Sequence, residues 1–263
     1  MQYTTREIRL AAALVEAADT LVEDFDVTQH LERTSDRCVE LLAARTAGVM
    51  LIDGDRAVSL VASSRNQGVA LDLLEAQHGG GPCLESYGSG RPVPPVSIRT
   101  AHVGARWPTF TERALRYDIV ATYAVPLRCR ETLLGALNVF VPTLPANDPP
   151  GDSAPELLVA QALADAAAVG LHNHRTYSRS LTLSGQLQQA LSSRVRIEQA
   201  KGMLAERWRV GADQAFIALR QYARRHRLPL DRVASAVIER VADDDALRRE
   251  AEGSLPGRPG GTP

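Results

Sequence analysis

Lysine is almost absent from this sequence. Lys201 is the only lysine among 30 basic residues, and the others are arginine. Aromatic residues make up 5% of the chain. No stretch approaches the roughly twenty apolar residues that a membrane-spanning helix needs. The N-terminal residues are polar and charged, which argues against a signal peptide. We therefore expect a cytosolic protein without a membrane anchor.

Cysteine is also scarce. Cys38, Cys83 and Cys129 are far apart and none belongs to a CxxC pair. This pattern predicts reduced thiols, and neither a disulfide framework nor a zinc site. His172 and His174 are two residues apart, so they would not share a helix face, and we expect no metal site there. The remaining composition, 44% hydrophobic and 23% charged over 263 residues, is typical of one large or two ordinary globular domains.

Positive charge is concentrated in one part of the chain. Between Arg194 and Arg232 there are ten basic and four acidic residues, which gives 10 − 4 = +6. The whole chain carries −1, so the remainder carries −7. Such an asymmetry is typical of a module that binds a polyanion, attached to an acidic body.

The basic segment has the hydrophobic period of three short helices. In the first helix, Arg194, Glu198 and Lys201 recur at the spacing i, i+4, i+7, where a core stripe would be apolar. Gly202 lies mid-helix at a cost of about 1 kcal/mol relative to alanine, which indicates that a backbone or ligand approaches closely. The expected polyanion-contacting residues are Arg194, Arg196, Lys201, Gly202, Arg220, Arg224 and Arg225.

Three ordered blocks carry a resemblance to a known family. They are SRVRIEQAKGML at 193–204, AFIALRQYAR at 215–224 and LDRVASAV at 230–237. Residues 187–242 resemble an ANTAR domain, the RNA-binding output module of bacterial transcription antiterminators. The resemblance implies that the basic residues above bind RNA. One departure is Gly211, where the family often has a serine cap; glycine caps a helix slightly less well.

The first part of the chain alternates helical and strand patterns. Glycines and prolines in the segment 78–97 predict an irregular loop. A turn signal, Asp53-Gly54-Asp55, joins the first two strands. The order of elements predicts an α+β domain with an antiparallel sheet. The expected helices are 6–24, 28–44 (capped by Thr28), 69–76 and 107–117, and the expected strands are 47–52, 57–62, 119–127 and 133–141.

Residues 25–173 resemble a GAF domain. The resemblance rests on GGGPCLES at 79–86, RWPTF at 106–110 and LLGALNVFV at 133–141. It implies a sensor domain with a central antiparallel sheet. The expected organisation is an N-terminal helix (1–24), the GAF-like sensor (25–173), a helical linker or coiled coil (174–186), the three-helix ANTAR domain (187–242) and a disordered tail (243–263).

The sequence is compatible with several ligands or sensing roles for the sensor domain. By the resemblance, Cys83, Trp107 and Tyr123 would lie near a small-molecule pocket. The alternatives are haem bound by His78 or His102, oxidation of Cys83, a merely structural Cys83, and a domain that binds nothing and only dimerises. Cys83 and His78 would make a catalytic pair only with a third, orienting group, and the sequence offers none. We expect no enzymatic activity.

The two domains are joined by a segment that favours helix. From Glu156 to Trp208 there is no proline, which predicts a near-continuous helix, kinked near Gly185. Paired with a second copy it would form a short parallel coiled coil. The resemblance thus implies a cytosolic homodimer that binds paired hairpin loops in nascent RNA, needs no cofactor for RNA binding, and prevents transcription termination. The alternatives are a DNA-binding regulator and a dimer whose output binds protein.

Overall fold

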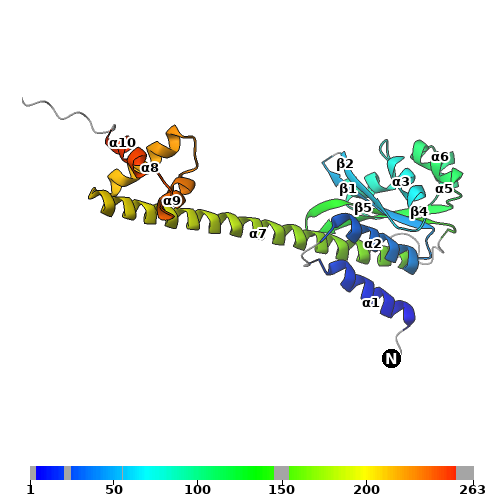
Figure 1. The fold of residues 1–263 in the computed structure, drawn as a ribbon. Helices are drawn as coiled ribbons and strands as arrows, with labels where there is room; N and C mark the ends of the chain where they lie inside the picture. Colours follow the sequence, from blue (N-terminus) through cyan, green and yellow to red (C-terminus); the bar gives the residue numbers. More distant parts are fainter. Residues whose placement is uncertain (1–3, 21–24, 55, 145–153, 253–263) are drawn as a thin grey trace, which may run out of the picture. The chain divides into compact units, whose positions relative to one another are not determined.

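The computed structural model divides the chain into two compact units, residues 1–178 and 179–263 (Figure 1). In the part of the chain that is described, no helix combines the length and apolar character needed to span a membrane. The described residues are 4–20, 25–54, 56–144 and 154–252.

The N-terminal unit is built on a five-stranded antiparallel sheet with the order β2-β1-β5-β4-β3. The two outer strands are β2 and β3, and β5 lies at the centre. This arrangement confirms the expected α+β architecture. The strands are β1 (Thr46–Asp53), β2 (Arg56–Ala62), β3 (Val93–Ser97), β4 (Ala121–Cys129) and β5 (Thr132–Val141).

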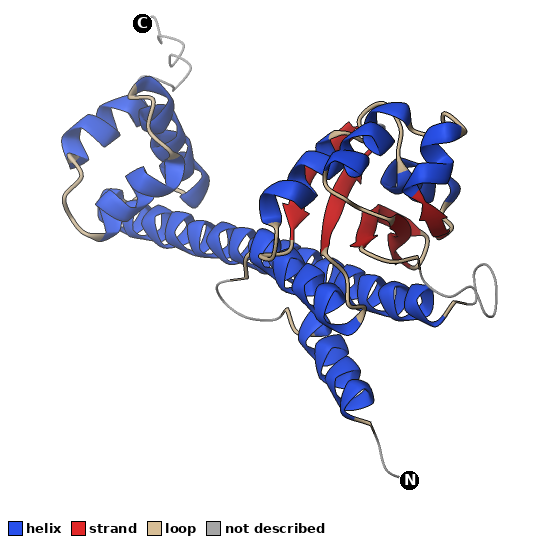
Figure 2. Cartoon of the chain, turned by 90° about the vertical axis from the view of Figure 1, so that its right-hand side faces the viewer, coloured by secondary structure: helices blue, strands red, loops and turns tan. Residues whose placement is uncertain are grey.

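Helices cover both faces of the sheet (Figure 2). One face packs against α2 (Val27–Leu41) and the first part of α7 (Pro155–Trp208), and α1 (Thr5–Ala18) packs on these two helices. Neighbouring residues of β5 show the division, because Val139 belongs to this apolar cluster and Phe140 to a cluster on the other face. The helices of the other face are α3 (Gln67–Glu75), α4 (Pro82–Ser89), α5 (Ile98–Val103) and α6 (Pro108–Arg116).

The segment 78–97 is not an irregular loop, so that prediction was wrong. It contains α4 and β3. Pro82 stands in the first turn of α4, where proline is favoured because its missing N–H has no helical partner. Gly90 ends the helix with φ of 63°, a left-handed conformation that glycine adopts without strain. The prolines of β3 are tolerated because this strand lies at the edge of the sheet.

Two boundaries of the first helices also differ from expectation. The cap of α2 is Asp26, whose carboxylate accepts a hydrogen bond from the Gln29 N–H at 2.8 Å, and not Thr28. An Asp at this position satisfies one of the unpaired N–H groups of the first turn. Helix α1 ends at Ala18, and the rest of the expected helix to residue 24 falls partly outside the described residues.

The C-terminal unit is a helical bundle. Helix α7 spans 54 residues without interruption at Gly185, which confirms the predicted long helix, though without a break at the expected kink. Ala200 and Leu204 of α7 pack against the following helices in one apolar cluster. The remaining helices of the unit are α8 (Ala212–Arg225), α9 (Leu230–Ile238) and α10 (Asp244–Glu252).

Helix α10 corrects the expectation of a disordered tail from residue 243. It packs on α8 and buries Leu247 completely in the bundle core. Asp243 caps it, because its carboxylate accepts a hydrogen bond from the Ala246 N–H at 3.1 Å. A fourth helix, α10, therefore packs on the three helices expected for residues 187–242. The last residues of the predicted tail, 253–263, lie outside the described residues.

We expect Leu247→Ala to destabilise the C-terminal unit by about 2–5 kcal/mol, the usual cost of removing a buried leucine side chain. The measurement is urea unfolding of the full chain followed by Trp208 fluorescence in a Trp107→Phe background. Asp245→Asn, an exposed change on the same helix, is the control and should leave the transition in place. Equal transitions for both variants would contradict the packing of α10.

Candidate nucleic-acid interface

The charged strip expected on the first helix of the basic segment lies on α7. Lys201 and Glu198 form an ion pair on this surface. The Lys201 side chain is 21% exposed and that of Glu198 is 55% exposed, so the lysine stem lies against the bundle and its ammonium reaches outward. Arg194, one turn earlier, is exposed. An exposed pair contributes only about 0–1 kcal/mol, so a phosphate can replace the Glu198 carboxylate.

Gly202 is exposed beside this strip. A Cβ atom built there would lie more than 4 Å from the heavy atoms of the described chain, outside its own helical turn. Packing within the chain therefore does not require glycine at this position. The open surface agrees with the expectation that something outside the chain approaches the helix here.

Arg196 lies on a different flank of α7. Its Nη2 atom is 3.3 Å from the Asp231 Oδ2 atom in the first turn of α9, and the side chain is about one-third exposed. A residue two positions from Arg194 points about 200° away around a helix. The structure therefore separates Arg196 from Lys201 and gives it a role in joining α7 to α9.

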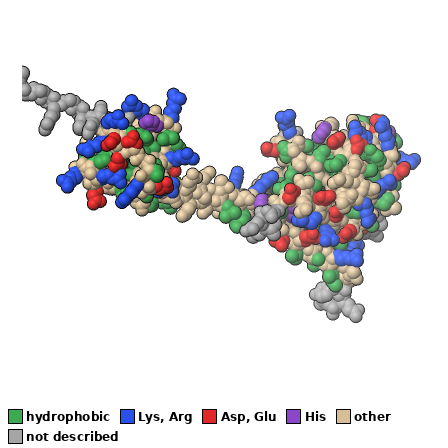
Figure 3. Space-filling model, viewed as in Figure 1, with side chains coloured by type: hydrophobic (Ala, Val, Ile, Leu, Met, Phe, Trp, Pro, Cys, Tyr) green, Lys and Arg blue, Asp and Glu red, His purple; other side chains and the backbone are tan. Residues whose placement is uncertain are grey.

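The α8 arginines form a second basic surface. Ala215, Leu219 and Ala223 face the core, and Arg220 and Arg224 are exposed on the opposite side. Arg224 and Arg225 stand in the last turn, where the negative end of the helix dipole favours cations. Figure 3 shows basic side chains spread over the C-terminal helices.

Arg207, near the end of α7, has an acidic partner from outside the expected three helices. Its Nη1 atom is 2.6 Å from each carboxylate oxygen of Asp244 in the first turn of α10. Because of this contact, one cation of the basic segment is paired with a carboxylate within the chain. Sequence reasoning missed it because the acidic run around Asp244 was assigned to a disordered tail.

The three residues expected near a sensor pocket do not come together. Cys83 is fully buried on α4, in a cluster with Met50 and Ala136. Trp107 begins α6, with its ring edge-on to Phe110 and 4.0 Å from the Arg106 guanidinium carbon. Both lie on the α3–α6 side of the sheet.

Tyr123 is fully buried on the other face, in the cluster of α2 and α7. Burial raises the pKa of its phenol. Large buried side chains cover the face of the sheet that lies against α3–α6, and they fill the space between the sheet and these helices. These side chains are Leu73, Ile98, Phe110 and Phe140.

The two histidines considered as haem ligands are both exposed. His102 lies on α5, and its Nδ1 atom is 3.2 Å from the Thr111 hydroxyl of α6. His78 follows α3. Among the described residues, no three His, Cys, Asp or Glu side chains gather in an arrangement that could hold a metal ion.

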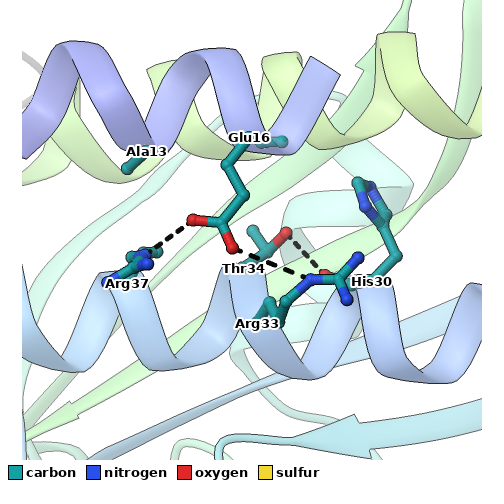
Figure 4. Close-up of a pocket in the computed structure, with 7 residues that line it drawn as sticks. Ala13, Glu16, His30, Arg33, Thr34 and Arg37 are labelled. Carbon is teal, nitrogen blue, oxygen red and sulfur yellow. Dashed lines mark hydrogen bonds and ion pairs between the residues drawn. The ribbon is translucent and has the colours of Figure 1, made fainter. Parts of the chain in front are cut away.

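A polar cluster between α1 and α2 was not expected from the sequence (Figure 4). Glu16 of α1 lies between two arginines of α2, 3.8 Å from the Arg33 Nε atom and 2.9 Å from the Arg37 Nε atom. The neighbouring cavity has a volume of only about 10 Å³, room for one water molecule. The cluster is therefore a helix-to-helix contact rather than a ligand site.

Helix α1 also packs closely on α7. A Cβ atom at Gly170 would lie 2.5 Å from the Ala17 carbonyl oxygen, so only glycine fits. The Thr20 hydroxyl donates a hydrogen bond to the Gly170 carbonyl at 2.8 Å. Gly170 within the alanine-rich first part of α7 was the signal in the sequence that could have indicated this contact.

Comparison with known protein families gives a match in the C-terminal unit. Residues 185–238 match the family model of the ANTAR domain. Comparison with curated proteins found no match. All seven residues expected to contact RNA fall within the matched range. The C-terminal unit therefore contains an ANTAR domain, as the three motif blocks indicated.

Solved GAF domains are among the structures that resemble the N-terminal unit. One, from an Acinetobacter phosphoenolpyruvate-protein phosphotransferase, has 14% identity over 67% of this chain and 99% of that chain, with a TM-score of 0.45. Another, from a Coxiella burnetii phosphotransferase, has 15% identity over 67% and 99%, with a TM-score of 0.45. The free methionine-R-sulfoxide reductase of Neisseria meningitidis has 18% identity over 66% and 96%, with a TM-score of 0.43. Likenesses this distant say nothing of a ligand or an activity.

The buried His30 gives the N-terminal unit a predicted pH dependence. Desolvation lowers the pKa of its imidazole from the usual 6.5 and outweighs a hydrogen bond with the Ala167 backbone and the charge of Glu16, both of which raise it. The folded protein then binds fewer protons than the unfolded chain below about pH 6.5. The free energy of unfolding should therefore be fully present above that pH and fall as the pH drops toward the folded-state pKa.

The measurement is urea unfolding followed by Trp107 fluorescence in a Trp208→Phe background, at pH values of about 7.5 and about 5.5. His30→Gln should reduce the loss of stability at the lower pH. The exposed His102→Gln is the matched control, and this variant should lose as much stability at the lower pH as the unmodified protein. A His30→Gln variant with unchanged pH dependence would show that other groups cause it.

Thiol reactivity follows from the burial of the cysteines. All three are buried, and desolvation raises the pKa of Cys38 to about 12 and that of Cys83 further. Because the thiolate is the reactive form, we expect iodoacetamide to label both residues only as fast as the native protein opens. Mass spectrometry of native and urea-unfolded protein tests this. Rapid labelling of native Cys83 would revive the oxidation-sensor alternative.

Proposed function

We propose that this protein is a cytosolic RNA-binding transcription antiterminator, whose ANTAR domain binds paired hairpin loops in nascent RNA under the control of the GAF-like unit. The observation that carries the proposal is the ANTAR match over residues 185–238, which contains the basic strip of α7 and the arginines of α8. The protein acts by binding, and holding the RNA element keeps the competing terminator hairpin from forming.

The strip on α7 supports this proposal physically. The Lys201 side chain is only 21% exposed and forms an ion pair with Glu198. Its conformation is therefore restricted before RNA binds, and little conformational entropy is lost when its ammonium contacts a phosphate. Arg194, Arg220 and Arg224 add exposed cations that neutralise the RNA backbone. Unstacked loop bases supply the sequence specificity, as is usual for RNA loops. Gly202 leaves space for the loop to approach the helix.

The middle of α7 supports a homodimer. Leu181, Leu183, Leu187 and Leu191 are 55–60% exposed, and every residue from 179 to 191 is exposed. Three of these leucines, Leu183, Leu187 and Leu191, lie within an arc of about 80° on α7, and pairing with a second helix would bury this exposed apolar line. A dimer presents two ANTAR domains to two hairpins of one transcript, and the second contact becomes intramolecular. A ligand, partner or redox change in the GAF-like unit would act by changing this pairing.

The first test is a filter-binding titration of the full chain with a two-hairpin RNA whose loops have six bases, at several salt concentrations. We expect Lys201→Ala to weaken binding about 10- to 150-fold, the equivalent of one charged hydrogen bond of about 1.5–3 kcal/mol. The slope of affinity against salt should fall by about 0.7 for the lost single-strand phosphate contact. Lys201→Arg keeps the positive charge and should lose less RNA affinity than Lys201→Ala.

Two controls accompany this titration. Arg56→Ala removes one exposed positive charge from β2 of the N-terminal unit and should leave RNA binding unchanged. A duplex DNA of equal length tests for a generic basic surface. Equal affinity for both nucleic acids, with no effect of Lys201→Ala, would refute RNA recognition and favour a DNA-binding or protein-binding output.

A further inference from the structure

The C-terminal unit carries an exposed aromatic ring at the end of α8. His226 follows the last residue of this helix, and its imidazole lies against the phenol ring of Tyr222. The ring centroids are 4.2 Å apart and the ring planes differ by 33°. His226 is exposed, whereas Tyr222, Trp208 and Phe216 are half-buried. Among the described residues of this unit, His226 is therefore the one ring that is open to solvent.

Tyr222 fixes the position of the His226 ring. The Tyr222 side chain packs against the apolar cluster of the helical bundle, so it is itself held in place. Residues four positions apart are neighbours on a helix surface, and the His226 N–H donates a hydrogen bond to the Tyr222 carbonyl at 3.0 Å. One face of the imidazole is covered by the phenol ring. Because His226 is exposed, the other face can receive a flat group without any rearrangement.

Exposed arginines flank the ring pair. Arg224 and Arg227 lie two positions before and one position after His226. The φ angle of Arg227 is 55°, a left-handed conformation that strains an arginine and that glycine adopts freely. The end of the helix closes around this residue, because the Leu228 N–H donates a hydrogen bond to the Ala223 carbonyl at 2.8 Å. The chain thus places a cation beside the ring at the position where glycine usually ends a helix.

A ring between cations suits an unpaired nucleotide. Every base has a flat face that can stack on an aromatic side chain, and the arginines neutralise the phosphate attached to it. A duplex hides the faces of its bases within the stack, whereas an unpaired loop base exposes them. The strip of Arg194, Glu198 and Lys201 on α7 contains no ring, so it can bind a phosphate and cannot stack on a base. The end of α8 supplies the contact that this strip lacks.

We propose that His226, backed by Tyr222, is the platform on which one unpaired base of an RNA hairpin loop stacks, and that the flanking arginines bind the phosphate of that nucleotide. The proposal rests on the RNA-binding function proposed above and assigns the residue that contacts a base. Ile197, one turn before Lys201, packs against the same apolar cluster as Tyr222, so the platform and the strip on α7 are built on one core. A purine stacks best, because its ring system is the larger.

The experiment measures binding of the full chain to the two-hairpin RNA with six-base loops at several salt concentrations. We expect His226→Ala to weaken binding about 5- to 150-fold, the range for the loss of one base stack. The slope of affinity against salt should stay unchanged, because stacking on a base releases no counterions from the RNA backbone. His226→Phe keeps an aromatic ring and should keep most of the affinity.

A series of abasic RNAs identifies the stacked base. In each RNA of the series, one loop position is made abasic in both hairpins. One member should bind the wild-type chain about as weakly as His226→Ala binds the unmodified RNA, and His226→Ala should lose no further affinity for that member. Both changes remove the same contact, so their effects cannot add. His102→Ala removes an exposed histidine of the N-terminal unit and should bind every RNA as the wild type does.

A second readout needs no protein variant. With 2-aminopurine at the identified loop position, fluorescence should fall when the wild-type chain binds, because this base is quenched by stacking. No quenching at any loop position would overturn the platform, as would a full His226→Ala loss with all six abasic RNAs or a His226→Phe variant as weak as His226→Ala. In these cases Lys201→Ala would still weaken RNA binding, and the proposed function would stand. Equal affinity of the wild-type chain for duplex DNA would instead refute the proposed function.

Discussion

Close packing of the alanine-rich face of α7 against the sheet shapes the N-terminal unit. Ala160, Ala164 and Ala168 are fully buried, so the helix backbone approaches the strands more closely than larger side chains would permit. α1 also packs closely on α7 at Gly170, because a methyl group at that position would collide with the Ala17 carbonyl oxygen. A helix held this tightly has little freedom to shift without disturbing α1, α2 and the sheet together. The ion pairs of Glu16 add a polar constraint at the outer surface.

Periodic elements could be predicted from the sequence, and elements that depend on one or two residues could not. Four strands and the ANTAR helices repeat apolar residues at regular spacing, which is a local signal. Helix α4 and strand β3 were hidden because proline and glycine were taken as breakers, although proline suits a first helical turn and an edge strand. Helix α10 depends on a single core anchor, Leu247, within an acidic and exposed sequence. No pattern on the helix itself distinguishes that anchor from a chance leucine.

The same distinction between local and tertiary signals applies to the candidate site residues. The spacing of Arg194, Glu198 and Lys201 placed them on one helix face because helical geometry is regular. The direction of Arg196 depends on Asp231, 35 positions later in the chain, and only the tertiary structure shows that contact. Tyr123 lies in a strand that is buried on both faces, so alternation of polar and apolar residues could not tell which face it takes. A site formed by residues from both faces of the sheet was therefore beyond local reasoning.

The rarity of lysine has a chemical consequence for this protein. Lys201 carries the only side-chain primary amine in the sequence, and that amine lies at the surface of the strip on α7. Acyl transfer to a lysine side chain of this chain can occur only there, and it would convert the cation into a neutral amide. The 29 arginines are inert to the same reaction and would keep the rest of the basic surface unchanged. Acylation of lysine side chains would thus act on this molecule at a single position, and it would break the ion pair between Lys201 and Glu198.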